Sequence, residues 1–112
     1  MWLHLTWEVE RKARWRTHRV EERLIAVDVS VTGMRVSART APGVEVGSTV
    51  TLRLNEFEAQ ARIRRVEPAD QPDVSLYGMQ FVEASNNFIE ALFVQAGLET
   101  RDAAEELWRR SH

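Results

Sequence analysis

Apolar and polar side chains alternate along several short stretches of this chain, and that period of two is the strongest constraint on its fold. In residues 3–9 the apolar residues occupy every second position, at Leu3, Leu5, Trp7 and Val9. Because successive side chains of a strand point to opposite faces, this pattern predicts a strand with one buried face. A chain built mainly from such segments belongs to the mainly β class.

The same alternation recurs in further runs that are bounded by turn-forming residues. Asn55 and Glu56 have the length and character of a short hairpin turn. Gly78, inside the last run, predicts a bulge or a close backbone approach. Strands are therefore expected over residues 23–29, 34–38, 49–54, 57–63 and 74–82.

From Ser85 the apolar period changes to that of a helix, and Gly97 is placed to end it. Thr100 can cap a second short helix that reaches Trp108. The strands predict a small antiparallel six-stranded barrel over about residues 2–83, sealed at one end by C-terminal helices over about 86–110. At 112 residues the chain encloses one modest core, so residues 1–112 form a single domain.

Composition limits the classes of function. The chain has no cysteine, which removes disulfides, thiolate metal sites and cysteine nucleophiles, and a reducing cytoplasm is the expected location. No apolar run is long enough to span a bilayer, and the three histidines lack the spacing of metal ligands. The chain also lacks a nucleophile elbow and a phosphate-binding glycine loop, so we expect no enzyme, cofactor or metal site.

Charge is distributed unevenly along the chain. The formal net charge is −2, which argues against a general polyanion binder and places nucleic acid low among the expected partners. Residues 11–19 nevertheless contain no acid, and we expect this basic segment to be a loop or an exposed hairpin arm. Trp15 lies among its cations and suits either stacking on a base or contact with a protein partner. The cations of the segment are Arg11, Lys12, Arg14, Arg16 and Arg19.

Residues 28–33 read DVSVTG and are followed by Met34 and Arg35. This segment resembles the PilZ domain family, which carries a DxSxxG motif at the corner between two barrel strands, commonly followed by an apolar residue and arginine. Two further segments are similar to the family in the same order: PGVEVGSTVTLRL to its glycine turn and next strand, and YGMQFV to its closing strand. The resemblance covers most of the chain and implies a PilZ-like β-barrel with a C-terminal helix.

The resemblance implies a signalling module that binds cyclic di-GMP. In that interpretation the Asp28 carboxylate accepts hydrogen bonds from a guanine edge, and the Ser30 hydroxyl adds another. Gly33 would adopt a positive φ that aims both side chains outward. The same letters also suit an ordinary turn, in which Asp28 and Ser30 bind their own backbone amides, and both interpretations remain open.

The second half of the family signature is an RxxxR motif, whose guanidinium groups bind phosphates and stack on guanine faces. Arg19 and Arg23 have this spacing, but they follow the basic segment, whereas the family places the motif ahead of its first strand. Three explanations are open: the basic segment has taken over the phosphate contacts, the domain no longer binds the nucleotide, or a segment upstream of this sequence carries the motif. The predicted ligand-binding residues are Asp28, Ser30, Gly33, Arg35, Arg14, Arg16, Arg19 and Arg23.

Three functions are therefore compatible with the sequence. The first is a PilZ-like module that binds cyclic di-GMP, and the second is a divergent PilZ-like adaptor that acts through protein contacts without the nucleotide. The third is a small barrel that binds single-stranded nucleic acid through the basic segment and Trp15. The expected partners are cyclic di-GMP and a protein.

Overall fold

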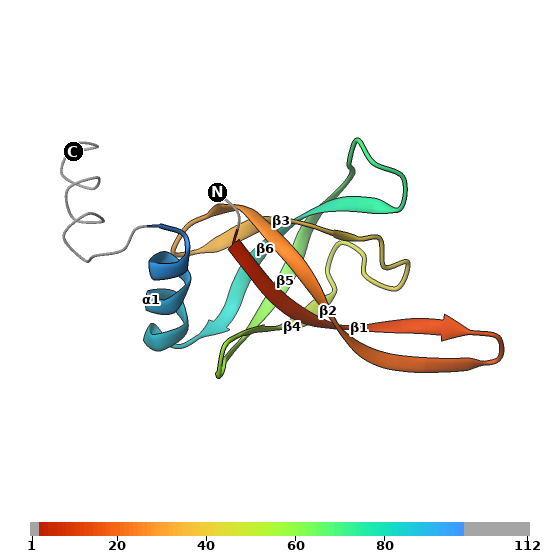
Figure 1. Ribbon diagram of the computed structural model, residues 1–112, viewed down its shortest axis with the longest axis horizontal. Helices are drawn as coiled ribbons and strands as arrows, with labels where there is room; N and C mark the ends of the chain where they lie inside the picture. The colour runs from red at the N-terminus through yellow and green to blue at the C-terminus, as the bar shows by residue number, and fades with distance from the viewer. Residues whose placement is uncertain (1–2, 98–112) are drawn as a thin grey trace.

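Six antiparallel strands close into a barrel within residues 3–97, the part of the chain that the computed structural model describes (Figure 1). The order around the barrel is β1-β2-β3-β6-β5-β4, and β4 returns to β1 at Thr6 and Trp7. The predicted mainly β barrel with a C-terminal helix is confirmed. The elements are β1 (Leu3–Ala13), β2 (Arg16–Val29), β3 (Gly33–Arg39), β4 (Thr49–Leu54), β5 (Phe57–Pro68), β6 (Val74–Ala84) and α1 (Asn86–Gln95).

Side chains that alternate in the sequence point alternately to the inside and the outside of the barrel. The alternating apolar residues of β1 are all buried, as predicted. Trp7 is 1% exposed and meets Tyr77 edge to face, with the ring centroids 5.1 Å apart. Two large aromatic side chains thus fill the middle of the barrel, where their burial contributes strongly to the core.

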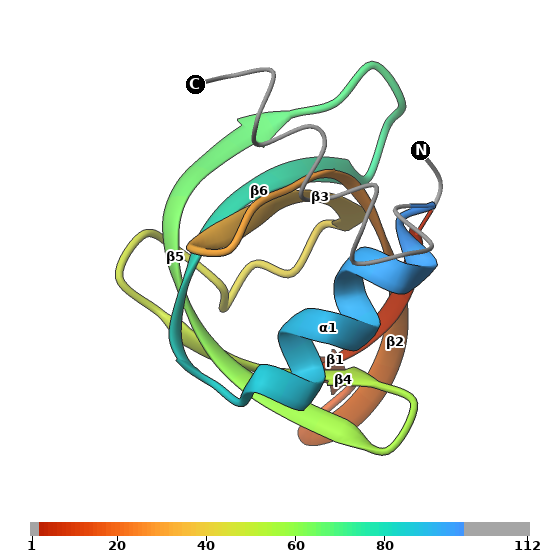
Figure 2. The same cartoon turned by 90° about the vertical axis from the view of Figure 1, so that its left-hand side faces the viewer.

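Helix α1 lies across one end of the barrel (Figure 2). The Ser85 hydroxyl accepts a hydrogen bond from the Phe88 amide at 3.1 Å and so caps the first turn. Phe88 and Leu92 are fully buried, and Gly97, with φ of 87°, follows the last turn. The predicted seal by the C-terminal helix is confirmed, whereas the second expected helix, over residues 100–108, lies outside the described residues.

At the other end, β1 and β2 continue past the barrel as a two-stranded arm, defined here as residues 10–20 (Figure 1). Its ladder runs from the Glu10–Arg19 pair to the Ala13–Arg16 pair, and no other strand within residues 3–97 pairs with it. Residues 12–19 are all exposed. Of the two predicted structures for the basic segment, the hairpin arm is the correct one.

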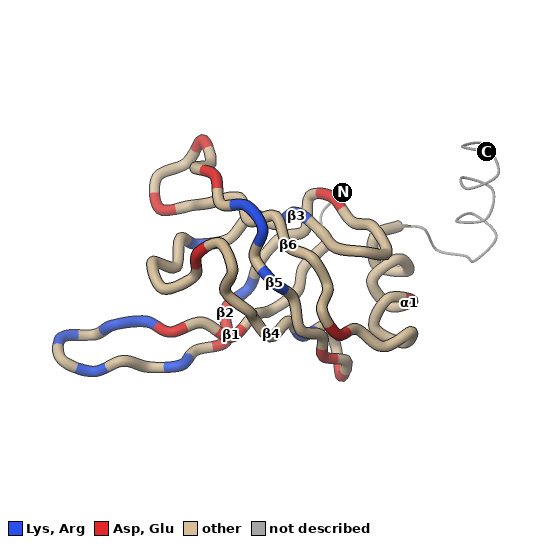
Figure 3. Tube along the Cα trace, turned by 180° about the vertical axis from the view of Figure 1, so that it is seen from behind, with Lys and Arg blue, Asp and Glu red and all other residues tan. Residues whose placement is uncertain are grey.

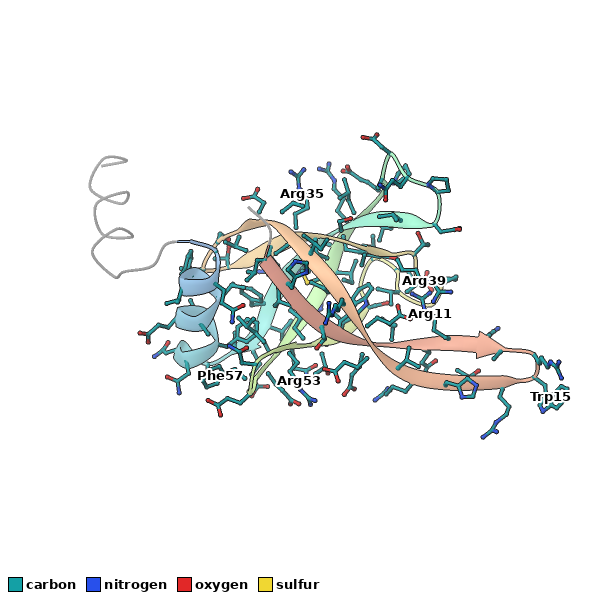
Figure 4. The ribbon with its side chains drawn as sticks, in the orientation of Figure 1. Arg11, Trp15, Arg35, Arg39, Arg53 and Phe57 are labelled. Atoms are coloured by element: carbon teal, nitrogen blue, oxygen red, sulfur yellow. The ribbon has the colours of Figure 1, made fainter. Side chains whose placement is uncertain are left out.

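An ion pair at the base of the arm closes this second end. The Arg11 guanidinium donates to the Glu22 carboxylate at 2.6 and 3.0 Å, and to the Thr40 carbonyl at 2.5 Å. The hydrogen bond from Arg11 lowers the pKa of Glu22, and its acceptance by Glu22 raises the pKa of Arg11. Arg39 approaches the same carboxylate at 3.4 Å (Figure 4). The Arg11 guanidinium is therefore occupied by Glu22 and Thr40, which distinguishes it from the exposed cations of the arm.

Candidate ligand-binding site

The turn between β2 and β3 is organised by Ser30. Its hydroxyl oxygen accepts hydrogen bonds from the amides of Thr32 and Gly33 at 3.3 and 3.2 Å, and its own amide donates to the Gly33 carbonyl at 2.9 Å. The hydroxyl also lies 3.2 Å from that carbonyl, to which it donates. Ser30 therefore caps the backbone of its own turn, which is the second of the two interpretations of its role.

The role predicted for Gly33 is wrong. We expected a positive φ, but the glycines with positive φ among the described residues are Gly47 and Gly97. A Cβ added at Gly33 would lie 2.1 Å from the carbonyl oxygen of Met79, so no side chain fits there. Glycine is required because β3 passes close to β6, which also holds the turn through the Phe81 amide and the Thr32 carbonyl at 2.8 Å.

Asp28 is exposed like Ser30, but its side chain forms no hydrogen bond or ion pair within residues 3–97. It pairs with Arg35 across the β2–β3 ladder, directly after a β-bulge that leaves Val27 unpaired. Side chains of paired residues point to the same face of a sheet. A carboxylate and a guanidinium therefore face the same solvent region, and no ion pair within 4 Å joins them.

Asp28 and Arg35 border an open hollow of about 440 Å³ on the outer face of the barrel. Across the hollow lies Arg64 of β5, whose Nε donates to the Gln80 side-chain oxygen at 2.9 Å. Gly78 forms part of the lining and adds no side chain to fill the space. The hollow thus has a free carboxylate on its rim and guanidinium groups on two strands.

The bulge or close approach predicted at Gly78 is confirmed. Gly78 pairs with Arg35 on one side and with Arg65 on the other, where the register of β5 shifts. A Cβ at Gly78 would lie 3.3 Å from the Cβ of Arg65, closer than ordinary packing distance. The glycine of β6 therefore lets Arg35 of β3 and Arg65 of β5 lie on either side of it.

Sequence reasoning missed the arginines of β5. Arg62, Arg64 and Arg65 are exposed, and β6 separates their strand from β3, which carries Arg35. The pairing of strands distant in sequence brings them beside the turn at residues 28–33. The segment RIRR at residues 62–65 was the available signal, but its position relative to Asp28 depends on the barrel topology. In Figure 3, blue segments mark arginines along β5 and, well separated from them, along the arm.

The arginines of the arm lie at the other end of β2. Arg19 precedes Asp28 by nine residues in the strand, about 30 Å at 3.3 Å per residue, and Arg14 and Arg16 lie still farther away. Figure 4 shows this separation between the labelled Trp15, at the tip of the arm, and Arg35. Arg23 lies between the two regions and lines a different depression, together with Arg53 and Glu21. The structure therefore brings Arg35 to Asp28 but does not bring the arm arginines there.

Comparison with known protein families gives a match over almost the whole described chain. A family model described as PilZ domain matches residues 4–95, which include nearly all of the barrel and α1. The chain belongs to the PilZ domain family. No curated protein and no solved structure matches it. PilZ domains are cyclic di-GMP effector domains and are not known as a family of enzymes.

In this PilZ domain the two halves of the family signature lie in different places. The residues of DxSxxG surround the hollow, with Asp28 exposed and with Ser30 and Gly33 shaping the turn. Arg19 and Arg23, which have the RxxxR spacing, lie on β2 on the side away from the turn. The cations nearest to Asp28 around the hollow are instead Arg35 and Arg64.

Within residues 3–97, no three histidine, aspartate or glutamate side chains gather closely enough to hold a metal ion. In the same range, α1 is too short to cross a membrane, and no other helix is present.

Proposed function

We propose that this PilZ domain binds cyclic di-GMP in the hollow beside the turn at residues 28–33. The observation that supports it most strongly is the free Asp28 carboxylate on the rim of a hollow that Arg35 and Arg64 also line. A carboxylate accepts two hydrogen bonds from the paired donors of a guanine edge. Guanidinium groups bind phosphate oxygens in a bidentate manner and stack on aromatic rings.

In this proposal each residue contacts a different part of the ligand or supports one that does. Asp28 contacts the guanine edge, and Arg35 and Arg64 contact phosphates, with Arg62 and Arg65 adding positive charge from the neighbouring strand. Ser30 and Gly33 act indirectly, because they fix the turn that holds Asp28 in place. The volume of about 440 Å³ lies within the usual range for small-molecule sites, about 300–1,000 Å³. The phosphate contacts predicted for Arg14, Arg16 and Arg19 are thereby assigned to other arginines.

Isothermal titration with cyclic di-GMP tests the proposal. Wild-type protein should give saturable binding, and Asp28→Asn should weaken it about 10-fold to 100-fold, because hydrogen bonds to a charged group contribute about 1.5–3 kcal/mol. The double variant Arg35→Gln/Arg64→Gln should lose binding by at least as much.

The double variant Arg14→Gln/Arg16→Gln is the matched control, since it removes the same charge from the arm and should bind normally. A flat titration with folded wild-type protein would reject the proposal and favour the adaptor hypothesis. Loss of binding in the arm variant, with normal binding by Arg35→Gln/Arg64→Gln, would assign the phosphate contacts to the arm.

A further inference from the structure

The tip of the arm combines an exposed indole with two guanidinium groups. Trp15 is 83% exposed, more than any other large apolar side chain among residues 3–97; Val31, at 65%, is second. Arg14 and Arg16 flank it and are exposed as well. Tryptophan has an apolar body and a polar N–H, and it is enriched where a bilayer meets water.

The residues at the tip are not explained by the needs of the turn. Arg14 has φ of 57°, in the left-handed region that glycine, asparagine and aspartate adopt most easily. In the β4–β5 turn of this chain, the comparable position with φ of 56° is occupied by Asn55. Arg14 forms no hydrogen bond or ion pair with the described residues, so nothing in the barrel offsets its unfavourable backbone conformation. The backbone conformation therefore does not account for an arginine at the tip, and its side chain remains as the reason.

The arm is cationic, whereas the rest of the chain is acidic. Residues 10–20 contain five Lys or Arg and one Glu, a net charge of +4. Because the formal net charge of the whole chain is −2, the remaining residues have a net charge of −6. Arg11 is neutralised by Glu22 at 2.6 Å. The other four cations are exposed, and the one ion pair among them within the described residues joins Arg19 to Glu8 at 3.7 Å, with 70% of the Arg19 side chain exposed. The four are Lys12, Arg14, Arg16 and Arg19.

These cations are distributed around the axis of the arm. Paired residues of a two-stranded ladder share a face, so Ala13 and Arg16 lie on one face, and Lys12 and Thr17 lie on the opposite face. Arg19, two residues from Thr17, shares the face of Lys12. A partner that covers one face of the arm would reach only part of this charge. A planar surface approached by the tip would meet cations on all sides.

We propose that the arm docks end-on against a lipid bilayer rich in anionic phospholipids. Trp15 would enter the interfacial layer, and Arg14 and Arg16 would contact lipid phosphates. From its tip pair to the Glu10–Arg19 pair, the arm measures about 10 Å, and the headgroup layer is about 5–8 Å thick on each side of the bilayer. The long side chains of Lys12 and Arg19 therefore reach the same layer.

The two features of the arm are the two signals that peripheral membrane binding usually requires, an apolar anchor and a polybasic segment. A ribbon that reads a nucleic acid groove presents one face to the bases, and binding of a single strand uses several stacked aromatic side chains. The arm presents a single aromatic side chain at its apex and has cations on both faces. Docking by the tip also leaves the hollow at residues 28–33 far from the membrane, so this proposal does not depend on nucleotide binding.

Co-sedimentation with phospholipid vesicles tests the docking. Wild-type protein should bind vesicles in proportion to their phosphatidylglycerol content, bind weakly to pure phosphatidylcholine, and dissociate as salt increases. The triple variant Lys12→Gln/Arg14→Gln/Arg16→Gln should partition about 100-fold more weakly, about fivefold for each cation. Trp15→Ala should also weaken binding and should abolish the quenching of tryptophan fluorescence by brominated acyl chains.

The triple variant Arg23→Gln/Arg39→Gln/Arg53→Gln removes the same charge from the barrel and should bind vesicles nearly as well as wild type. Circular dichroism would verify folding, which is expected because residues 12–19 are exposed and none of them belongs to the hydrophobic core. Equal binding to neutral and anionic vesicles, or equal loss in the two triple variants, would overturn the proposal. Tighter arm-dependent binding to a single-stranded or duplex oligonucleotide at the same salt would overturn it in favour of nucleic acid.

Discussion

Asp28 faces solvent because a β-bulge adds one residue, Val27, to β2. Leu24 and Ala26 are buried, and an unbroken alternation would place Asp28 on the same inner face. The bulge reverses the direction of every side chain after it, so the carboxylate leaves the barrel and lies beside Arg35. One extra backbone residue thus exposes the carboxylate to solvent, where regular alternation would have buried an unpaired charge inside the barrel.

Because the Asp28 carboxylate is exposed and forms no hydrogen bond or ion pair in the described residues, its removal should leave the fold unchanged. We expect Asp28→Asn to alter the free energy of unfolding by less than about 0.5 kcal/mol. Ser30→Ala should lower it by about 1 kcal/mol, since it removes hydrogen bonds within the turn. Urea denaturation of both variants measures the difference, and a large destabilisation by Asp28→Asn would indicate a structural role for the carboxylate.

Gly33→Ala should be the more damaging change in this turn. Its new methyl group would meet the Met79 carbonyl oxygen, so β3 and β6 must separate, and we expect a loss of at least about 2 kcal/mol in unfolding free energy. Gly43→Ala is a matched control, because a Cβ there has no neighbour within 4 Å and should change stability by less than about 0.5 kcal/mol. Urea denaturation would contradict this account if the two variants proved equally stable.

The arm illustrates what alternation in the sequence does and does not predict. Strands with a buried face, such as the first part of β1, were predicted because every second residue is apolar. The outer parts of β1 and β2 have no buried face, so their pattern left a loop and a hairpin equally acceptable. Their extended structure follows from β1–β2 pairing, which continues past the barrel to Ala13 and Arg16.

Relief of the backbone conformation at the tip should stabilise the arm. Arg14→Gly places the residue that most easily adopts φ near 57° at this turn, and we expect a gain of about 0.5–1 kcal/mol in local stability. Hydrogen exchange of the amides at residues 12–17 measures it, because exchange there reports local opening. Asn55→Gly, in the β4–β5 turn, is the control and should give little change. Faster exchange in Arg14→Gly would show that the arginine side chain stabilises the turn.

The ion pair at the base of the arm should make stability depend on pH. Arg11 lowers the pKa of Glu22 in the folded protein, so the stabilisation is complete above the unfolded pKa, near 4.5. It is lost as the pH falls through the lower folded pKa. Glu22→Gln should therefore reduce stability at neutral pH by about 2 kcal/mol, and this difference should shrink under acid conditions.

Thermal or urea unfolding as a function of pH tests this prediction. Glu56→Gln, at an exposed position in the β4–β5 turn, is the matched control at neutral pH and should have little effect. A difference between wild type and Glu22→Gln that stays constant down to strongly acid pH would show that the pair does not stabilise the folded state in this way.

At the scale of the molecule, the two regions for which functions are proposed lie far apart along β2. The hollow with Asp28 and Arg35 lies near the β2–β3 turn, and the arm with Trp15 extends from the opposite end (Figure 4). The DxSxxG segment predicted the first region from sequence, because the motif is local. The position of Arg64 beside the same hollow as Asp28 was not predictable in this way, since it depends on the order β3-β6-β5 around the closed barrel.

The distance between the arm arginines and Asp28 follows from the geometry of an extended strand. Arg19 and Asp28 are close in sequence, but an extended strand converts nine residues into about 30 Å. Closeness in sequence would indicate closeness in space for a loop or a helix, whereas along one strand it does not. The expected shared site thus depended on the structure of residues 16–23, which the alternation could not determine.

The most direct test of the proposed nucleotide site is a map of backbone amide NMR shifts during titration with cyclic di-GMP. We predict saturable changes at residues 28–35, at 62–65 and around Gly78, with little change at residues 12–19. Changes confined to the arm, or the absence of saturable changes anywhere in the folded protein, would contradict the assignment of ligand binding to the hollow.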